Sequence, residues 1–415
     1  MQVCPKRKKK KSGAVGITIL SVLYVILVVL IPILGFGNKG SGTNTILKAL
    51  IFITYLIVML FQSHFRMQLN RTNIYILFSF LITQGFCIVF TDYSVNIINV
   101  VIQAAIFFAL LFLLPVVQGQ KKEIITGIKL FVLFDFVAAI YNFILHFERY
   151  ANLSFLNTVY YDMHSFFDNK NTYGGILFVA LVLLFYWYYL CDKEDKRTRK
   201  WVIVLICVQI FAIATSMCRT ALVCTFVFLF CNFFKKFTTK RFFAAPALLA
   251  LIGLAFAIPS VREYLLYILL RVDVDTFREP IVEASWQIVE NNMLFGTGLG
   301  SWEGTLEAIS GNPYSHNGFL TILMTGGAIY FLAYITLFIY GLRWALRITK
   351  VDFGFGSQVV ICLITVVIYA FFESIVLCEA NSSNFAFTTA ALIIPRLYWN
   401  QYVRSGSKEQ HIQER

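Results

Sequence analysis

Three basic residues lie beside long apolar stretches, where a charged side chain is unusual. Arg219 interrupts 212-AIATSMCRTALVCTF-226, Arg278 stands shortly before a predicted helix, and His316 lies in 313-PYSHNGFLTILMTGG-327. A charge near the end of a membrane span is costly unless it faces protein or water, so each is a candidate for function. His316 could take a proton from a substrate held at the level of the lipid headgroups, because histidine titrates near neutral pH. The alternatives are an arginine that snorkels to the headgroups at 219, a solvated loop arginine at 278 and a structural histidine at 316.

Two weaker signals lie close to these residues in the sequence. The stretch 295-FGTGLGSW-302, which contains Gly298, has glycines whose backbone amides could approach an anion. It does not follow a strand, as a dinucleotide-binding fingerprint requires. Asn171 lies in 168-DNKNTYGGIL-177, where a helix begins and where helix capping is the alternative to substrate binding.

Two acidic residues fall within apolar stretches. Glu373 stands at the end of the predicted span 357-374, where it could pair with an arginine of the site. Asp135 lies in the middle of the predicted span 124-147, and we interpret it as structural, packed against Lys129 or a polar group.

The composition predicts an integral membrane protein. Of 415 residues, 59% are hydrophobic and only 14% are charged, whereas a soluble domain carries about 25% charged residues. Long apolar runs recur throughout 1-415, which favours one all-α polytopic membrane domain over two or three soluble domains. The net charge of +13 is assigned to short loops on one side of a membrane rather than to nucleic-acid binding.

The apolar runs predict about twelve transmembrane helices, each of about 20 residues. They lie near 13-36, 45-62, 72-91, 94-117, 124-147, 171-190, 200-217, 218-234, 243-260, 317-342, 357-374 and 380-398. The basic tail 1-12, the tail 399-415 and the basic short loops then share one side, which the positive-inside rule identifies as the cytoplasm. The run at 13-36 is too long for a cleaved signal peptide and is predicted to be a signal anchor in the cell membrane.

Only two predicted outer loops are long, at 148-170 and 261-316. The second contains two amphipathic stretches, 260-272 and 280-290, the latter opened by a first-turn proline. Both are expected to be helices along the outer surface, so the functional site is expected to face outside.

The cysteines do not indicate a metal site. The nine cysteines include no CxxC pair, so neither a metal site nor a disulfide scaffold is predicted. Cys218 and Cys378 could pair near the outer face. No metal or cofactor is expected.

The order of these segments resembles the superfamily of O-antigen ligases and O-antigen polymerases. The resemblance lies over 168-330: an asparagine-rich helix start, then SMCRTAL, an arginine about twenty residues before GxGxG, then SHNGFL with two glycines following. The chain departs from the family pattern in two places. Cys218 stands where the family usually has serine before arginine, and Gly326-Gly327-Ala328 replaces the usual Gly-x-x-Gly.

The resemblance implies a GT-C-like membrane glycosyltransferase that needs no metal. Such enzymes take a glycan from an undecaprenyl-pyrophosphate carrier and join it to a hydroxyl of a glycan or lipid acceptor at the outer leaflet. By resemblance, Arg219 and Arg278 would contact the pyrophosphate, His316 would be the catalytic base and Asn317 would orient it. The product would be a cell-surface polysaccharide such as capsule, exopolysaccharide or O-antigen, and a chain-length regulator and a flippase would be partners.

Two questions stay open at this point. A polymerase joins one lipid-linked repeat to another, while a ligase transfers a finished chain, and the sequence does not separate the two activities. The alternative function is a multispan transporter of lipid-linked sugars or small solutes, which twelve spans fit equally well. Transporters usually have polar groups near the bilayer midplane and related halves, whereas the candidate residues here gather at one face.

Overall fold

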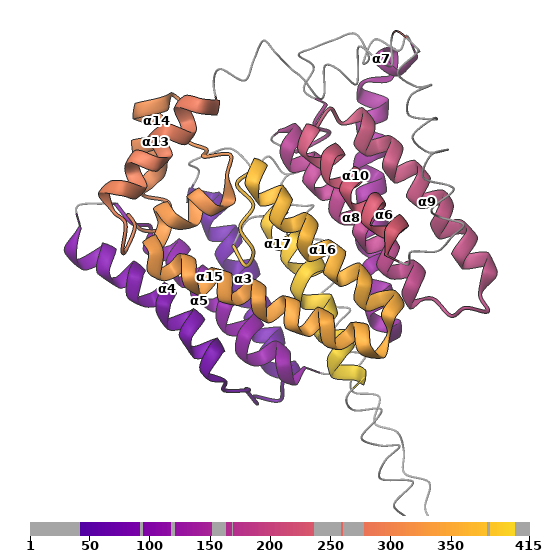
Figure 1. Cartoon of the computed structure of the whole chain (residues 1–415), viewed down its shortest axis with the longest axis horizontal. Helices are drawn as coiled ribbons and strands as arrows, with labels where there is room; N and C mark the ends of the chain where they lie inside the picture. Colours follow the sequence, from indigo (N-terminus) through magenta and orange to yellow (C-terminus); the bar gives the residue numbers. More distant parts are fainter. Residues whose placement is uncertain are drawn as a thin grey trace, which may run out of the picture.

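The computed structural model describes residues 42–91, 94–117, 121–151, 163–167, 169–235, 259, 278–379 and 382–402. In this part of the chain every regular element is a helix (Figure 1). Several sequence predictions lie outside these residues: the tail 1-12, the spans 13-36 and 243-260, the amphipathic stretch 260-272 and most of the tail 399-415. Most of the loop 148-170 and the first part of the loop 261-316 lie outside them as well.

Seven helical segments are long and apolar enough to cross a membrane, as expected for an all-α membrane protein. They are α4 (Arg71–Phe90), a continuous segment of α5 (Ile97–Phe108), η2 (Ala109–Leu113) and η3 (Leu114–Val116), then α6 (Lys121–Leu145), α8 (Lys170–Leu190), α9 (Lys196–Thr215), α15 (Gly318–Val351) and α16 (Phe353–Phe372). Each agrees with a predicted span to within a few residues, except that α15 runs nine residues further, to Val351.

Three further predicted spans are helical, but within the described residues they are not among the helices long and apolar enough to cross a membrane. They are α3 (Gly42–Gln62), α10 (Arg219–Phe234) and α17 (Ser382–Thr388), which continues through η6 (Thr389–Ile393) to residue 402. The structure therefore supports a multi-pass helical fold, while the number twelve stays a prediction. Three short helices complete the described chain: α7 (Phe147–Ala151), α13 (Arg278–Asn291) and α14 (Trp302–Ser310).

The helices α15, α16 and α17 form the middle of the bundle. In Figure 1 they lie between α3 to α5 on one side and α6 to α10 on the other. Helix α15 packs against α16 and α4, and α16 packs against α8 and α10. Helix α8 is the most enclosed, with 78% of its apolar window buried, whereas α9 at 28% lies at the edge. The exposed faces remain apolar, with large side chains such as Trp201, Phe211 and Leu332 outermost, as a lipid-facing surface requires.

Consecutive helices run in opposite directions, which places five helix ends together. The starts of α8, α10 and α15 and the ends of α9 and α16 lie at the same end of the bundle, hereafter the site end. Polar residues specify two of these starts. Asn169 accepts a hydrogen bond from the Thr172 amide at 2.8 Å, and Asn317 accepts two from the first turn of α15. Such caps satisfy amides that the first helical turn leaves without a partner.

Helix α15 is interrupted at Gly326 and Gly327, whose backbone angles are not helical. The segment 293–298 inserts its backbone at this break. Thr297 donates its amide to the Met324 carbonyl at 2.7 Å, and the Ala328 amide donates to the Met293 carbonyl at 2.8 Å. Gly327 has φ +60°, and a Cβ there would lie 2.3 Å from the Leu294 backbone. Glycine is therefore required for this close approach.

The loop from α16 to α17 turns back into the bundle. Leu377 and Cys378 are both fully buried, and the Leu377 amide donates to Tyr334 in the interior of α15 at 2.8 Å. Cys378 is thus not at an outer face, and both it and Cys218 are free thiols. The suggested disulfide between them is wrong, because the loop carries Cys378 away from the helix ends.

Asp135 is fully buried in α6. Lys129, proposed as its neighbour, instead lies over the Trp187 ring at 5.1 Å from the ring centre. The polar residue beside Asp135 is Gln209 of α9, so the second option, packing against a polar group, describes its surroundings.

Candidate functional site

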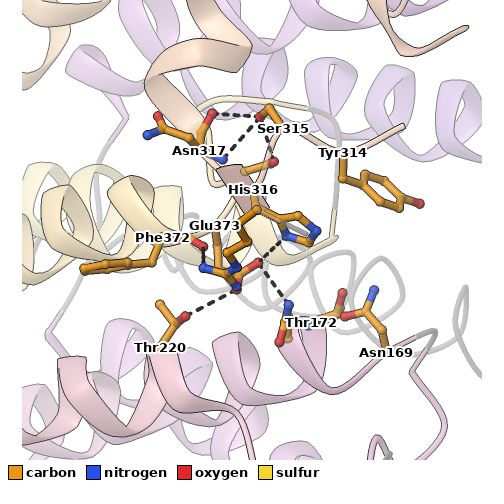
Figure 2. A network of polar contacts seen from close by, with 12 residues as sticks. Asn169, Thr172, Thr220, Tyr314, Ser315, His316, Asn317, Phe372 and Glu373 are labelled. Atoms are coloured by element: carbon orange, nitrogen blue, oxygen red, sulfur yellow. Dashed lines mark hydrogen bonds and ion pairs between the residues drawn. The ribbon is translucent and has the colours of Figure 1, made fainter. Parts of the chain in front are cut away.

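Glu373 is the centre of a polar network at the site end (Figure 2). It directly follows α16, and its side chain is only 8% exposed. One carboxylate oxygen, Oε2, accepts from the Asn171 amide group at 3.1 Å and lies 3.4 Å from His316 Nδ1. The other, Oε1, accepts from the Thr220 hydroxyl at 3.2 Å and lies 3.5 Å from Arg278 Nη2. One buried carboxylate therefore ties α8, α10, α13 and the start of α15 together.

His316 lies in a strained turn immediately before α15. Its φ is +48°, a left-handed conformation that is uncommon outside glycine. The turn is held by the buried hydroxyl of Ser315, which hydrogen-bonds Thr321 at 2.8 Å and Ser374 at 3.2 Å. Strain of this kind persists only where the surroundings impose the conformation, and it is frequent at functional sites. The turn holds the imidazole against Glu373.

Asn317 has a different role from the one that the resemblance implied. Its side-chain oxygen accepts from the amides of Phe319 and Leu320 at 3.0 and 3.1 Å, and its amide group donates to the Phe371 carbonyl at 3.3 Å. It caps α15 and joins this helix to α16. The structure assigns the orientation of His316 to Glu373, because the Asn317 oxygen is occupied by the helix start.

Arg219 is the first residue of α10 and directly follows a sharp turn, in which Met217 has φ +57°. The turn packs closely on α8. A Cβ on Gly174 would lie 2.4 Å from Cys218 Cβ, so the glycine brings the two helices together. This contact sets where α10 begins, and therefore where the side chains of Arg219 and Thr220 project.

Arg278 is the first residue of α13 rather than a residue preceding it. Its guanidinium contacts the Phe372 carbonyl at 3.4 Å besides Glu373, and its side chain remains 37% exposed. Both contacts are long for hydrogen bonds. The guanidinium group has five N–H donors, so it can bind a further acceptor in the cavity.

A single cavity of about 370 Å³ joins these residues. Its lining includes Arg219, Thr220, Arg278, Ser315, His316 and Asn317 on the polar side, and Val223, Ile281, Val282, Phe371 and Phe372 on the apolar side. Small-molecule sites typically have volumes of about 300 to 1,000 Å³ with a few convergent polar groups. The three basic residues selected from the sequence thus line one space, although they come from three different helix starts.

Gly298 lies elsewhere. Its amide donates to the Thr325 carbonyl at 3.1 Å, and neighbouring Leu299 donates to Gln84 of α4 at 2.7 Å. The Gly296 amide also has a partner within the protein, because it donates a hydrogen bond to the Asn292 carbonyl. The expectation that these amides approach an anion is corrected, because they hold the 293–298 segment against α4 and the break in α15.

Replacing Gly298 by alanine is expected to destabilise the protein by about 1 to 3 kcal/mol, as for strained or overpacked positions. Gly298 has φ +97°, and a Cβ would lie 2.4 Å from Val95 Cγ2. Thermal unfolding of the purified protein measures the change. Gly304→Ala in α14 is the control, because a Cβ there meets open space. Loss of activity at unchanged thermal stability would contradict this structural role.

Two residues of the site, and one helix elsewhere, escaped the sequence prediction. Thr220 and Ser315 stand beside the selected residues Arg219 and His316, so adjacency was an available signal. Helix α14 was not predicted, and Trp302 at its start is a buried residue that donates to Thr325 at 3.2 Å. Among the described residues, no group of three His, Cys, Asp or Glu side chains is arranged to hold a metal ion.

The arrangement combines a histidine paired with a carboxylate and two guanidinium groups around one cavity. A histidine that donates Nδ1–H to a carboxylate has Nε2 available to accept a proton, as in catalytic triads. The two arginines can bind a phosphate-like anion. The fold and site thus define a helical protein with segments long and apolar enough to span a membrane, and with a cavity lined by two arginines and a carboxylate-paired histidine. Comparison with known proteins finds no family model that matches the chain and no curated protein that matches it.

Proposed function

We propose that the chain is a GT-C-like membrane glycosyltransferase that polymerises or ligates lipid-linked oligosaccharides into a cell-surface polysaccharide. The donor is a glycan on undecaprenyl pyrophosphate, and the acceptor is a hydroxyl of a glycan or lipid. The observation that carries the proposal is that His316, which is paired with Glu373, lines the same cavity as Arg219 and Arg278. A base beside two cations suits attack by a hydroxyl with departure of a pyrophosphate.

The reaction needs one proton acceptor and charge stabilisation at the leaving group. Nε2 of His316 takes the proton of the acceptor hydroxyl as that oxygen forms a bond to the anomeric carbon. The bond from the anomeric carbon to the pyrophosphate oxygen breaks, and its electron pair leaves with the carrier. Arg219 and Arg278 stabilise the charge that develops on the pyrophosphate, and Glu373 stabilises the imidazolium until His316 releases its proton.

The apolar side of the cavity suits a lipid carrier. Val282, Phe371 and Phe372 line it and are 45%, 56% and 47% exposed. Apolar side chains this exposed are stable where lipid covers them. A polyprenyl chain can therefore lie along this edge of the bundle while its pyrophosphate reaches the arginines inside.

The distribution of basic residues supports a site on the outer face. At the end opposite the site, basic residues lie at the start of α6, in the loop from α8 to α9, at the start of α9 and at the end of α15. They are Lys121, Lys122, Lys193, Lys196, Arg197, Arg199, Lys200, Arg343, Arg347 and Lys350. The positive-inside rule assigns that end to the cytoplasm. Both termini are then cytoplasmic, and the site faces outward from the cell membrane.

We favour a polymerase over a ligase, because the two long outer loops have no feature in the sequence that suggests recognition of a dedicated acceptor. A polymerase would act together with a flippase that supplies the repeats and with a regulator that sets chain length.

Arg219→Gln and Arg278→Gln test the proposal. Removing one donor from a charge-stabilising site lowers turnover by about 10²- to 10³-fold in known enzymes, and each variant is expected to show a loss of this order. The measurement is chain elongation by purified protein in proteoliposomes supplied with undecaprenyl-pyrophosphate-linked repeats, with products resolved by size. Arg197→Gln is the matched control, because Arg197 is exposed at the opposite end.

Unchanged elongation in both arginine variants would contradict the proposal. If the wild-type protein moved the lipid-linked sugar across the bilayer without forming any glycosidic bond, the transporter alternative would replace it.

A further inference from the structure

Arg396 is buried at the end of the bundle opposite the site. It lies in the helical stretch that continues from η6, and only 7% of it is exposed. Its guanidinium stacks on the ring of Trp344 in α15, 3.8 Å from the ring centre, and Nη2 donates to Gln68 at 3.2 Å. Nε and Nη1 are also buried and have no hydrogen-bond partner. A buried cation with two unused donors is costly unless an acceptor is supplied.

A second arginine places another positive charge close to Arg396. Arg347 lies one turn beyond Trp344 and places its guanidinium 4.8 Å from the centre of the same ring. The ion pairs of the described residues include no carboxylate bound to Arg396 or Arg347. Two positive charges, one buried at Arg396 and one exposed at Arg347, thus lie against one aromatic ring. An anion between them would relieve their repulsion and satisfy the unused donors.

The surroundings of Arg396 are apolar on the remaining sides. Arg396 and Trp344 line a pocket together with Leu110, Leu114, Leu337 and Leu392. These leucines come from η2, η3, α15 and η6, which all line the pocket. The pocket has a volume of only about 30 Å³, which is too small for an acyl chain, so a ligand would meet Arg396 and Arg347 from the surface of the bundle.

We propose that Arg396 and Arg347 bind the phosphate of an anionic membrane phospholipid, whose acyl chains lie outside the pocket against exposed apolar side chains of α15 such as Leu342 and Leu346. Guanidinium groups bind phosphate oxygens through paired N–H donors. A phospholipid with no cationic headgroup matches the two unpaired charges, whereas a zwitterionic lipid brings its own cation. The site is separate from the cavity at His316 and does not depend on the glycosyltransferase proposal.

Thermal unfolding in nanodiscs tests the site. The wild-type protein is expected to unfold roughly 3 to 6 °C higher in phosphatidylglycerol discs than in phosphatidylcholine discs, a shift typical of a bound ligand. Arg396→Met should lose this difference, since it keeps the side-chain length and removes the guanidinium. Arg343→Met is the matched control, because Arg343 is exposed on α15, the helix of Trp344 and Arg347, and lies outside the pocket. It should retain the difference.

Three results would overturn the proposal. One is an equal unfolding temperature of the wild-type protein in both lipids, and another is a lipid-dependent difference that persists in Arg396→Met. The third is an equal shift caused by inorganic phosphate in detergent, which would identify a soluble phosphate as the ligand. Native mass spectrometry of the wild-type protein from mixed micelles gives a test that needs no variant. Retained phosphatidylglycerol is expected, and retention of phosphatidylcholine to the same extent would contradict the site.

Discussion

Replacing His316 by alanine is expected to abolish long polysaccharide chains at the cell surface while the protein remains at normal levels in the membrane. Alanine removes the imidazole, which among the described residues lining the cavity is the group that can accept a proton from a hydroxyl and has a carboxylate partner. Loss of a general base lowers rates by about 10²- to 10⁴-fold. The measurement is surface polysaccharide from the native host, resolved by size, with the protein quantified in parallel.

His64→Ala is the control for this experiment, because His64 is exposed in a turn at the opposite end of the bundle. Accumulation of single repeats on the carrier lipid in His316→Ala would identify a polymerase. Accumulation of finished chains on the carrier would identify a ligase. Normal long chains would exclude His316 as the base and favour the transporter alternative.

Replacing Glu373 by alanine is expected to reduce glycan transfer nearly as much as the loss of His316, by about 10²- to 10⁴-fold. The variant removes the partner that fixes the imidazole and the acceptor shared by Asn171, Thr220 and Arg278. Buried donors left without an acceptor cost about 1 to 3 kcal/mol each, so some loss of thermal stability is expected as well. Initial elongation rates in proteoliposomes and thermal unfolding measure the two effects separately.

The isosteric variant Glu373→Gln distinguishes positioning from support of the fold. Glutamine keeps one acceptor oxygen and the shape of the side chain, but it cannot stabilise an imidazolium by charge. We expect near-normal stability with most of the activity lost. Glu290→Gln on the exposed surface of α13 is the matched control. If Glu373→Gln retained full activity, the carboxylate would have only a structural role.

Much of the helical architecture follows from local sequence. The apolar runs at 171-190, 200-217 and 357-374 predicted α8, α9 and α16 to within a few residues, because a span needs about 20 apolar residues in a row. The amphipathic stretch predicted at 280-290 is helical and lies within α13, with Pro280 near the beginning of its described part. These features depend on residues that are neighbours in the chain, so the sequence was sufficient.

The glycines show where local reasoning fails. The GxGxG segment looked suited to an anion, yet Gly296 and Gly298 are required because the backbone of α15 and the side chain of Val95 lie against them. The residues that demand glycine are distant in sequence. A glycine pattern alone cannot distinguish close backbone packing from ligand binding. Both need a residue that has no Cβ and can adopt backbone angles unfavourable for other residues.

The sequence by itself determined that this chain is built from apolar helices and that Arg219, Arg278 and His316 are unusual in their surroundings. Composition, run length and charge decide these points without reference to distant residues. Only the tertiary structure decided that the three side chains line one cavity, with Glu373 as the shared partner of Arg278 and His316. It also decided that Arg396 is buried against Trp344 with no carboxylate of the described residues bound to it. Such groupings depend on which helix ends meet, and that is set by the packing of α8, α10, α15 and α16 against one another.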